Sequence, residues 1–531
     1  MTAPIEYPPA VAPTDVPPGR TTTSRDHQKR FSVGESSRAA LRLVRADRNI
    51  GLALGVGLAV TWGLLAGMWM PRGPLTTTHV VASMLAGLLT GGVAGYASGS
   101  RWSVVAAPVA FAAVFEFART GTVGPTTEGF HASFYGLLAM VTGRGVHGLV
   151  SLAPMALAAV AGGAVARRGL GVSKRRHTGR RVGVIVLAAL VAVPSLLFIR
   201  PASTAAIVDS AGRPISGSVA ELTTVNINSH DLAMMIRGVD TSNPVLLFLA
   251  GGPGGSELGA MRRHLSGLEE HFVVVTWDQR GSGKSYAALD PTSTLTLESV
   301  VDDTIAVTNY LRERFGQDRI YVAGQSWGTT LGVLAVQQRP DLYQAFIGTG
   351  QMVSQRETDL IFYEDTLVWA KQTGRIDLFT ELVKAGPPPY EEIYPYETLL
   401  AQEPDVYPYD HTGNSEGAGQ MAENILVPEY SLLDQVHIFA GFVDTFSVLY
   451  PQLQEIDFRE TATDFDVPVF FVQGAHEARG RAQPFAEWYA MVDAPMKDTV
   501  TFETSGHRPL WEQPEEFVDY MTGTVLAETR S

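Results

Sequence analysis

Residues 319–338 read RIYVAGQSWGTTLGVLAVQQ, and the expected fold follows mainly from this segment. Its first five residues form an apolar run of strand length, whereas the residues after Gly328 follow a helical pattern. A strand that runs into a helix through G-x-S-x-G predicts a sharp turn with Ser326 exposed at its apex. Gly324 and Gly328 lack side chains, so the strand and the helix can approach each other closely. The alternative is a serine that only caps a helix starting at Trp327.

A second glycine-rich segment lies upstream, directly after a predicted buried strand at 245–249. It reads AGGPGG and includes Gly251, Gly252, Pro253 and Gly254. If Ser326 is a nucleophile, the carbonyl group that it attacks needs backbone N–H groups to bind the developing oxyanion. We predict that Gly252 and Trp327 supply these two donors. An ordinary Gly/Pro loop is the other interpretation of the segment.

A serine nucleophile also requires a base, which in this strand–turn–helix arrangement is a histidine that follows both the serine and the acid. The histidines after Ser326 are His411, His437, His476 and His507. We predict His507 as the base, because it follows a predicted strand at 499–503 and precedes the last helix. His411 lies in a polar loop and His437 in a helical pattern, which favours structural or solvent-facing roles for them.

The acid is expected at the end of the strand that precedes the base. A predicted strand at 468–472 is followed by Gly474-Ala475-His476-Glu477, so Glu477 is our candidate. Asp464 and Asp466 precede that strand and would lie at the opposite edge of the sheet. A surface carboxylate is the alternative for Glu477.

From residue 201 onward, apolar runs of strand length alternate with helical patterns. Strands are expected at 219–227, 231–237, 245–249, 272–276 and 319–323, and helices at 258–271 and 297–315. This alternation predicts an α/β fold with a mostly parallel, doubly wound sheet. We expect residues 201–350 and 456–531 to form the two parts of this core, with a helical insertion at 351–455 between them.

Four motifs in this order resemble the proline iminopeptidase-type serine hydrolases of the α/β-hydrolase fold. They are GGPGG at 251–255, WDQRGSGKS at 277–285, GQSWG at 324–328 and SGH at 505–507. The resemblance implies a lidded hydrolase that cleaves an amide or ester through an acyl-serine intermediate, often at the N-terminal residue of a short peptide. It further implies that the insertion is the cap, which decides the choice of substrate.

Within this resemblance, several residues shape the loops rather than react. Asp278 and Arg280 are expected to tie loops together beside the site, and the structural set comprises Gly251, Pro253, Gly254, Asp278, Gln279, Arg280, Gly324 and Gly328. A phosphate loop at 277–285 is excluded because the G-x-x-x-x-G-K spacing is absent. Two positions depart from the family. Ala250 replaces the usual histidine and Glu477 the usual aspartate, although glutamate serves in other triads of this fold.

The insertion is strongly acidic. Residues 351–455 carry 18 acidic and 4 basic residues, a net charge of −14. Such a surface could attract a positively charged α-amine. Carboxylates that merely face water are the alternative, and no amine-binding glutamate can be assigned to a position.

Residues 1–200 have a different composition from the rest of the chain. They contain 20 Lys and Arg against 7 Asp and Glu, whereas the remaining 331 residues contain 20 against 47. Residues 1–20 hold six prolines and few bulky apolar residues, and we expect residues 1–48 to form a disordered, basic tail. About five membrane spans are expected within 49–200, with apolar runs at 50–70, 79–97, 102–117, 147–166 and 182–199. A sixth run, 130–142, is too short to cross and predicts an interfacial or re-entrant piece.

Basic residues fix the expected orientation of these spans. They precede the first span, as in Arg42, Arg45 and Arg48, and they fill the loop before the last span, as in Arg175 and Arg176. Both segments belong on the cytoplasmic side by the positive-inside rule. This requires an even number of crossings between them, which favours four. We therefore expect a multi-pass protein of the cell membrane with a cytoplasmic N-terminus and an extracytoplasmic hydrolase domain.

Composition narrows the function further. The chain has no cysteine, which excludes disulfides, thiolate metal sites and thiol nucleophiles. The acidic C-terminal part argues against binding to nucleic acid, and the predicted mechanism requires neither a metal nor a cofactor. The expected partners are a small peptide or ester substrate and the lipid bilayer, and the oligomeric state stays open. A carboxylesterase or lipase, a non-catalytic membrane sensor and a transporter are the alternatives.

Overall fold

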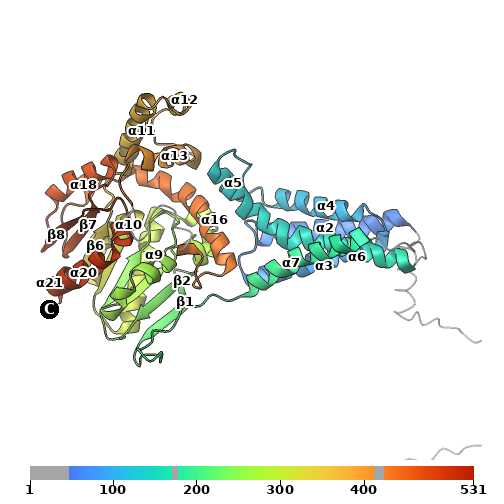
Figure 1. The fold of residues 1–531 in the computed structure, drawn as a ribbon, viewed down its shortest axis with the longest axis horizontal. Coiled ribbons are helices and arrows are strands. Elements are labelled where there is room, and N and C mark those ends of the chain that lie inside the picture. The colour runs from blue at the N-terminus through green and yellow to red at the C-terminus, as the bar shows by residue number, and fades with distance from the viewer. Residues whose placement is uncertain (1–46, 170–177, 412–423, 531) are drawn as a thin grey trace, which may run out of the picture.

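The structure is a computed structural model that describes residues 47–169, 178–411 and 424–530. The predicted disordered tail lies almost entirely outside these residues. The described chain has two parts, a bundle of long helices and an α/β domain, which meet end to end (Figure 1).

The bundle packs through small residues. Its helices are α2 (Arg48–Trp69), α3 (Thr77–Ser98), α4 (Ser103–Ala118), α5 (Phe134–Met140), α6 (Ala153–Gly169) and α7 (Thr178–Ile199). A Cβ atom on Gly91 would lie 1.9 Å from the Met155 carbonyl oxygen, and one on Gly95 would lie 2.1 Å from that of Ala159. Glycine at these positions therefore allows α3 and α6 to touch backbone to backbone.

The prediction for residues 130–142 as a separate interfacial piece is wrong. Two π-helical segments, Val141–Gly145 and Gly148–Leu152, join α5 to α6. The result is one continuous apolar helix, Phe134–Arg167, of 34 residues. Gly143 does not end it, because this glycine serves packing: its Cβ atom would lie 2.2 Å from the Thr126 carbonyl oxygen.

Four helices of the described residues are long and apolar enough to cross a membrane. They are Arg48–Trp69, Thr77–Ser98, Phe134–Arg167 and Leu432–Glu455, with Ser103–Ala118 as a shorter apolar helix. The fourth belongs to the α/β domain and packs against its core through residues such as Val443 and Phe446. Its apolar character is thus explained by burial within the protein.

The α/β domain is built on an eight-stranded sheet with the order β1-β2-β4-β3-β5-β6-β7-β8. The strands are β1 (Val219–Ile227), β2 (His230–Gly238), β3 (Val245–Leu249), β4 (Val273–Trp277), β5 (Ile320–Gln325), β6 (Tyr343–Thr349), β7 (Val469–Gly474) and β8 (Lys497–Phe502). β2 pairs antiparallel with β1 and β4, and the remaining pairs are parallel. The predicted α/β architecture is confirmed.

Helices cover both faces of the sheet, as a mostly parallel sheet requires. They are α8 (Leu258–His264), α9 (Leu297–Phe315), α10 (Trp327–Gln338), α18 (Arg479–Met491), α19 (Pro509–Glu512), α20 (Pro514–Tyr520) and α21 (Leu526–Thr529). A capping box between Thr296 and Ser299 starts α9, and Gly316 at φ 65° ends it. The helix predicted over 258–271 stops at His264, and a 3₁₀ segment, Ser266–Glu270, follows it.

A helical insertion separates β6 from β7. It contains α11 (Gln355–Gln372), α12 (Ile376–Ala385), α13 (Ile393–Leu400), α14 (Glu403–Val406) and α16 (Leu432–Leu449), and α17 (Phe458–Thr461) follows. We call these residues, 351–455, the insertion. Figure 1 shows α16 between the sheet and the end of the bundle where α5 lies, so the insertion adjoins both parts of the molecule.

Candidate active site

Ser326 occupies the sharp turn between β5 and α10. Its backbone has φ 53° and ψ −120°, a conformation that side-chain-bearing residues rarely adopt. Cβ atoms on the flanking glycines would collide with backbone, at 2.4 Å from the Gly328 oxygen for Gly324 and 2.0 Å from the Leu249 oxygen for Gly328. Any side chain at position 324 or 328 would clash with backbone atoms, so this turn requires glycine at both positions.

The structure brings the predicted base and acid to this serine. His507, in the loop after β8, places Nε2 2.9 Å from the Ser326 Oγ atom. Its Nδ1 atom lies 2.6 Å from Oε2 of Glu477, which follows β7. Three loops at the carboxyl ends of parallel strands thus converge, although 181 positions separate the serine from the histidine.

Glu477 is held as a buried carboxylate. Its side chain is 3% exposed, and its Oε1 atom accepts hydrogen bonds from Arg481 Nε at 2.7 Å and from the Ala478 N–H at 2.8 Å. Burial by itself raises the pKa of this carboxyl group, but the positive charge of Arg481 and the contact with His507 outweigh it. The pKa of Glu477 therefore falls to about 2, and the group stays ionised in neutral and mildly acidic solution.

Arg481 is a residue of this site that the sequence analysis missed. Besides Glu477, its guanidinium binds Glu403 of the insertion and lies 4.8 Å from the centre of the Phe362 ring, also in the insertion. The spacing of four residues between Glu477 and Arg481 on the start of a helix was a usable signal. The Glu403 contact spans 78 positions and has no local signature.

The glycine-rich segment after β3 lies beside the turn. Gly252 has φ 136°, and Gly254 has φ 90°. The Trp327 indole donates to the Gln279 side chain at 2.8 Å, and the Gln279 amide donates to the Ala250 carbonyl oxygen at 3.1 Å. Gln279 thus connects the residue after Ser326 to the start of the glycine-rich segment.

Asp278 and Arg280 connect the loop after β4 to neighbouring elements. The Arg280 guanidinium binds Asp303 of α9 through two hydrogen bonds of 2.8 and 2.7 Å. Asp278 accepts from the Lys284 N–H at 2.8 Å and from the Tyr430 hydroxyl of the insertion at 3.2 Å. Burial raises the pKa of the fully enclosed Asp278 to about 7.

The other histidines have neighbours that explain them structurally. The buried His437 places Nε2 3.1 Å from the Pro74 carbonyl oxygen in the bundle. His476 stacks on Tyr409 at 5.0 Å, and His411 lies 3.9 Å from the same ring. Within the described ranges, no three His, Cys, Asp or Glu side chains are grouped in a way that could hold a metal ion.

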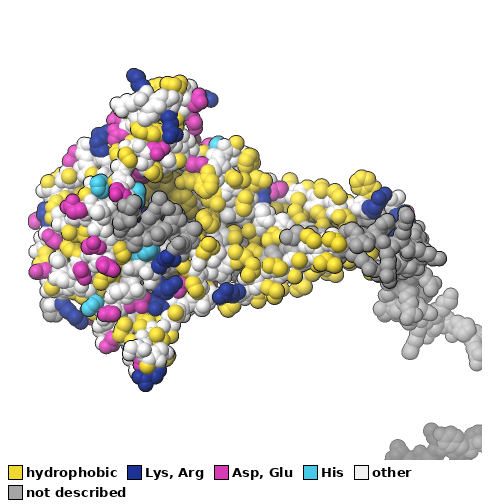
Figure 2. Space-filling model, viewed as in Figure 1, with side chains coloured by type: hydrophobic (Ala, Val, Ile, Leu, Met, Phe, Trp, Pro, Cys, Tyr) yellow, Lys and Arg dark blue, Asp and Glu magenta, His cyan; other side chains and the backbone are white. Residues whose placement is uncertain are grey.

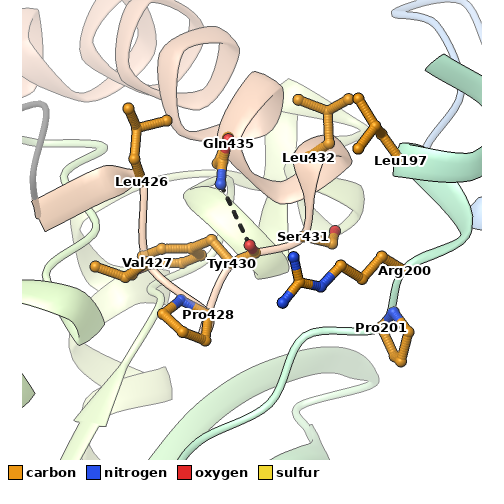
Figure 3. A pocket seen from close by; sticks show the side chains of 10 residues that line it. All are labelled: Leu197, Arg200, Pro201, Leu426, Val427, Pro428, Tyr430, Ser431, Leu432 and Gln435. Atoms are coloured by element: carbon orange, nitrogen blue, oxygen red, sulfur yellow. Dashed lines mark hydrogen bonds between the residues drawn. The ribbon is translucent and has the colours of Figure 1, made fainter. Parts of the chain in front are cut away.

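A cavity of about 290 Å³ lies elsewhere, between the end of α7 and the start of α16 (Figure 3). Leu197 and Arg200 line it from the bundle side, and Leu426, Ser431 and Gln435 from the insertion. Ser326, Glu477 and His507 are not among its lining residues. The cavity is therefore separate from the serine–histidine–glutamate cluster.

The fold and this cluster define the class of protein, and comparison with known families gives the same answer. Residues 244–514 match the family model described as alpha/beta hydrolase fold, and the chain belongs to this family of hydrolases.

Among its relatives, a probable aminopeptidase of Bacillus subtilis (strain 168), YbaC, is 30% identical over 316 residues, which cover 58% of this chain and 97% of the relative. A probable proline iminopeptidase of Leptolyngbya boryana is 34% identical over 142 residues, covering 26% of this chain and 41% of the relative. Among solved structures, a proline iminopeptidase of Mycobacterium smegmatis has a TM-score of 0.43 at 19% identity, with 57% of this chain and 97% of that chain covered.

Proposed function

We propose that this protein is a membrane-anchored serine hydrolase that removes the N-terminal residue of short peptides through an acyl-serine intermediate. The observation that carries the proposal is the geometry of Ser326, His507 and Glu477, with a strained turn and two hydrogen-bond-length contacts. The match to YbaC, which spans nearly the whole length of a protein named as a probable aminopeptidase, supports a peptide rather than an ester as the substrate.

In this mechanism, Ser326 Oγ attacks the substrate carbonyl carbon while His507 Nε2 takes the hydroxyl proton. The carbon–nitrogen bond then breaks, and the same proton passes from Nε2 to the leaving amine. Water attacks the acyl-serine in a second round with His507 again as base, which releases the acid and restores the hydroxyl group. Glu477 keeps the imidazole oriented and offsets its positive charge throughout.

The N–H groups of Gly252 and Trp327 are the proposed oxyanion donors. Trp327 is the first residue of α10, so its N–H is one of those that helical hydrogen bonding leaves unused. Each donor stabilises the transition state by about 3 kcal/mol if it acts like other oxyanion donors. No metal or cofactor has a role in these steps.

The test of this mechanism is labelling of the full-length protein by a fluorophosphonate, which reacts with an activated serine. We expect the wild-type protein to be labelled and Ser326→Ala to be inert. Ser256→Ala, in the adjacent loop, is the matched control and should stay labelled. Labelling that persists in Ser326→Ala would rule out this nucleophile.

An esterase acting on acyl chains is the second candidate. Large apolar side chains on the insertion support it, since Val368, Ile376 and Val383 of α11 and α12 are each more than half exposed. Turnover of proline anilide against nitrophenyl esters of increasing chain length separates the two substrates. A preference for long acyl esters over the anilide by a factor of ten or more would favour the esterase.

Apolar surface on the bundle supports the proposed membrane anchor. Hydrophobic side chains cover the middle of the bundle, where few charged side chains are visible (Figure 2). Trp69, at the end of α2, is 58% exposed, and Trp102, just before α4, is 72% exposed. Aromatic residues are often found at membrane–water interfaces. In the proposed topology the N-terminus is cytoplasmic, and α2, α3, α4, the continuous α5–α6 helix and α7 each cross the membrane once. The hydrolase then lies outside the cytoplasm.

A reporter fused to the C-terminus tests this orientation. We expect alkaline phosphatase to be active there and green fluorescent protein to be dark, because both reporters depend on the side of the membrane. The reverse pattern would place the hydrolase in the cytoplasm.

A further inference from the structure

A buried ion cluster joins the bundle to the insertion. Arg72, in the connection between α2 and α3, donates from Nη1 to Asp444 of α16 at 2.9 Å. Its Nε and Nη2 atoms bind Asp290 at 2.9 and 3.0 Å. The Arg72 and Asp444 side chains are 1% and 0% exposed. Because an unpaired buried charge is strongly destabilising, removing either residue should lower the stability of the protein.

Asp444 depends on the bundle for most of its hydrogen bonds. Thr126, between α4 and α5, donates to it from its backbone N–H at 3.0 Å and from its hydroxyl group at 2.6 Å. Tyr286 of the α/β domain adds a hydroxyl donor at 2.7 Å. Burial lowers the pKa of Arg72, but Asp444 and the other negative groups more than offset this, so the pKa stays above its usual value.

Glycine makes this close approach possible. Gly124 has φ 134°, and a Cβ atom there would lie 2.8 Å from both Arg72 Nη1 and Asp444 Oδ1. The loop between α4 and α5 can therefore pack directly against the Arg72–Asp444 pair because residue 124 is glycine.

The turn of α16 that carries Asp444 also contacts the glycine-rich segment beside Ser326. A Cβ atom on Gly254 would lie 2.8 Å from the Gly441 oxygen and 3.0 Å from the Phe442 Cα atom. The Thr445 hydroxyl group donates to the Gly281 carbonyl oxygen at 3.0 Å. A displacement of α16 would therefore move the segment that contains Gly252.

Two more contacts fasten the bundle to the insertion. The Glu397 carboxylate of α13 accepts the N–H groups of Phe134 and Tyr135 at 2.7 and 2.9 Å, at the start of α5. The Tyr135 ring meets Phe442 of α16 edge to face at 5.7 Å. The junction is therefore fixed at several points, and Asp444 is its buried centre.

We propose that the bundle is a working part of the hydrolase: Arg72 and Asp444 are positioning residues that set α16 and, through it, the oxyanion-binding segment at 251–255. The role given to that segment rests on the proposed function. The bundle therefore supports the reaction itself in addition to holding the enzyme in a membrane.

The test uses the full-length protein in detergent micelles, with p-nitrophenyl acetate as a small substrate. Active sites are titrated with a fluorophosphonate, so that kcat is expressed per competent serine and misfolded protein is not counted. For Arg72→Met we expect kcat per site to fall at least tenfold with KM changed by less than about twofold. Arg72→Lys should recover part of the loss. Arg213→Met, which breaks the exposed pair with Asp209, is the control and should leave kcat unchanged.

A second variant keeps the proposal testable if Arg72→Met does not fold. Thr126→Val removes one hydroxyl donor to Asp444 and should lower kcat per site by a smaller factor in the same direction. Wild-type kcat per site in a folded Arg72→Met, or in Thr126→Val when Arg72→Met does not fold, would overturn the proposal. Failure of the proposed function would instead appear as unchanged labelling of Ser326→Ala, or as a wild-type protein that is neither labelled nor active.

Discussion

Arg481 and Arg72 are both buried arginines that bind carboxylates of the insertion, but they reach different parts of the proposed site. Arg481 touches the carboxylate that holds the imidazole, so it lies one residue from the reacting histidine. Arg72 comes from the bundle and acts on Asp444, so its effect on the oxyanion-binding segment passes through α16. The insertion is therefore fixed from two sides. Because Arg481 contacts Glu477 directly, its loss should reduce activity more than the loss of Arg72, which acts through α16.

The largest effect is expected for Arg481→Met. The buried Glu477 and the partly exposed Glu403 would both lose their cation. Breaking a buried ion pair costs about 3–5 kcal/mol, and Glu477 would no longer be held against His507, so kcat/KM should fall by about 100-fold or more. Burial would then raise the pKa of Glu477, and the acid limb of the pH profile should move to higher pH. Profiles of kcat/KM between pH 4 and 9 measure both changes.

Arg479→Met is the matched control for this variant, because Arg479 lies two residues away and pairs with Asp365 near the surface. It should stay within about twofold of the wild type, as expected for an exposed pair. An Arg481→Met enzyme with an unshifted acid limb would show that Arg481 does not act through Glu477.

A smaller loss is expected for Gly254→Ala, which tests the path through α16. The new methyl group would press on Gly441 and Phe442 and separate α16 from the segment after β3. We expect kcat to fall by about 10- to 100-fold, less than the roughly 100- to 1,000-fold loss caused by removing an oxyanion donor outright. Gly212→Ala supplies the control, since Gly212 also has a positive φ of 75° but open space around it. Equal losses in both variants would point to backbone strain alone.

Tyr286→Phe should have a more modest effect on the same side of the comparison. It removes one hydroxyl donor from the buried Asp444 carboxylate, a loss of about 1–3 kcal/mol. The thermal midpoint should drop by several degrees and kcat by less than about tenfold. Tyr310→Phe is the control, because the Tyr310 hydroxyl group accepts a hydrogen bond from the exposed Arg314 and lies away from Asp444. A midpoint unchanged from the wild type would show that Thr126 and Arg72 satisfy Asp444 by themselves.

The smallest effect on activity is expected for Asp278→Asn, whose distinguishing effect is on the pH dependence of stability. The pKa of Asp278 is raised to about 7 in the folded protein, so between pH 4 and 7 the folded state binds more protons than the unfolded state. This group therefore lowers stability as the pH rises through that window, by at most about 1.4 kcal/mol per pH unit. In Asp278→Asn the thermal midpoint should decline less from pH 5 to pH 7. An identical decline in both proteins would show that Asp278 does not titrate there.

Local motifs allowed much of the fold to be predicted. The ranges expected for β1, β3 and α9 agree with the observed elements, because each is a strongly patterned segment with clear turn or capping residues at its ends. The turn at Ser326 could be predicted because only glycine fits at positions 324 and 328, which makes the motif recognisable. The prediction failed for 130–142, because Gly136 and Gly143 pack closely against the loop before α5 and do not end the helix.

Local sequence patterns were enough to derive the order of strands and helices along the chain, the serine turn, and the placement of His507 and Glu477 after particular strands. These follow from periodicity and from the rule that the carboxyl ends of parallel strands share one edge. Tertiary structure alone decided that Arg481 binds Glu403 and that Arg72 binds Asp444, 372 positions away. A charge whose partner is distant in the sequence leaves no local pattern that reveals that partner, and such pairs form only when tertiary packing brings the two groups together.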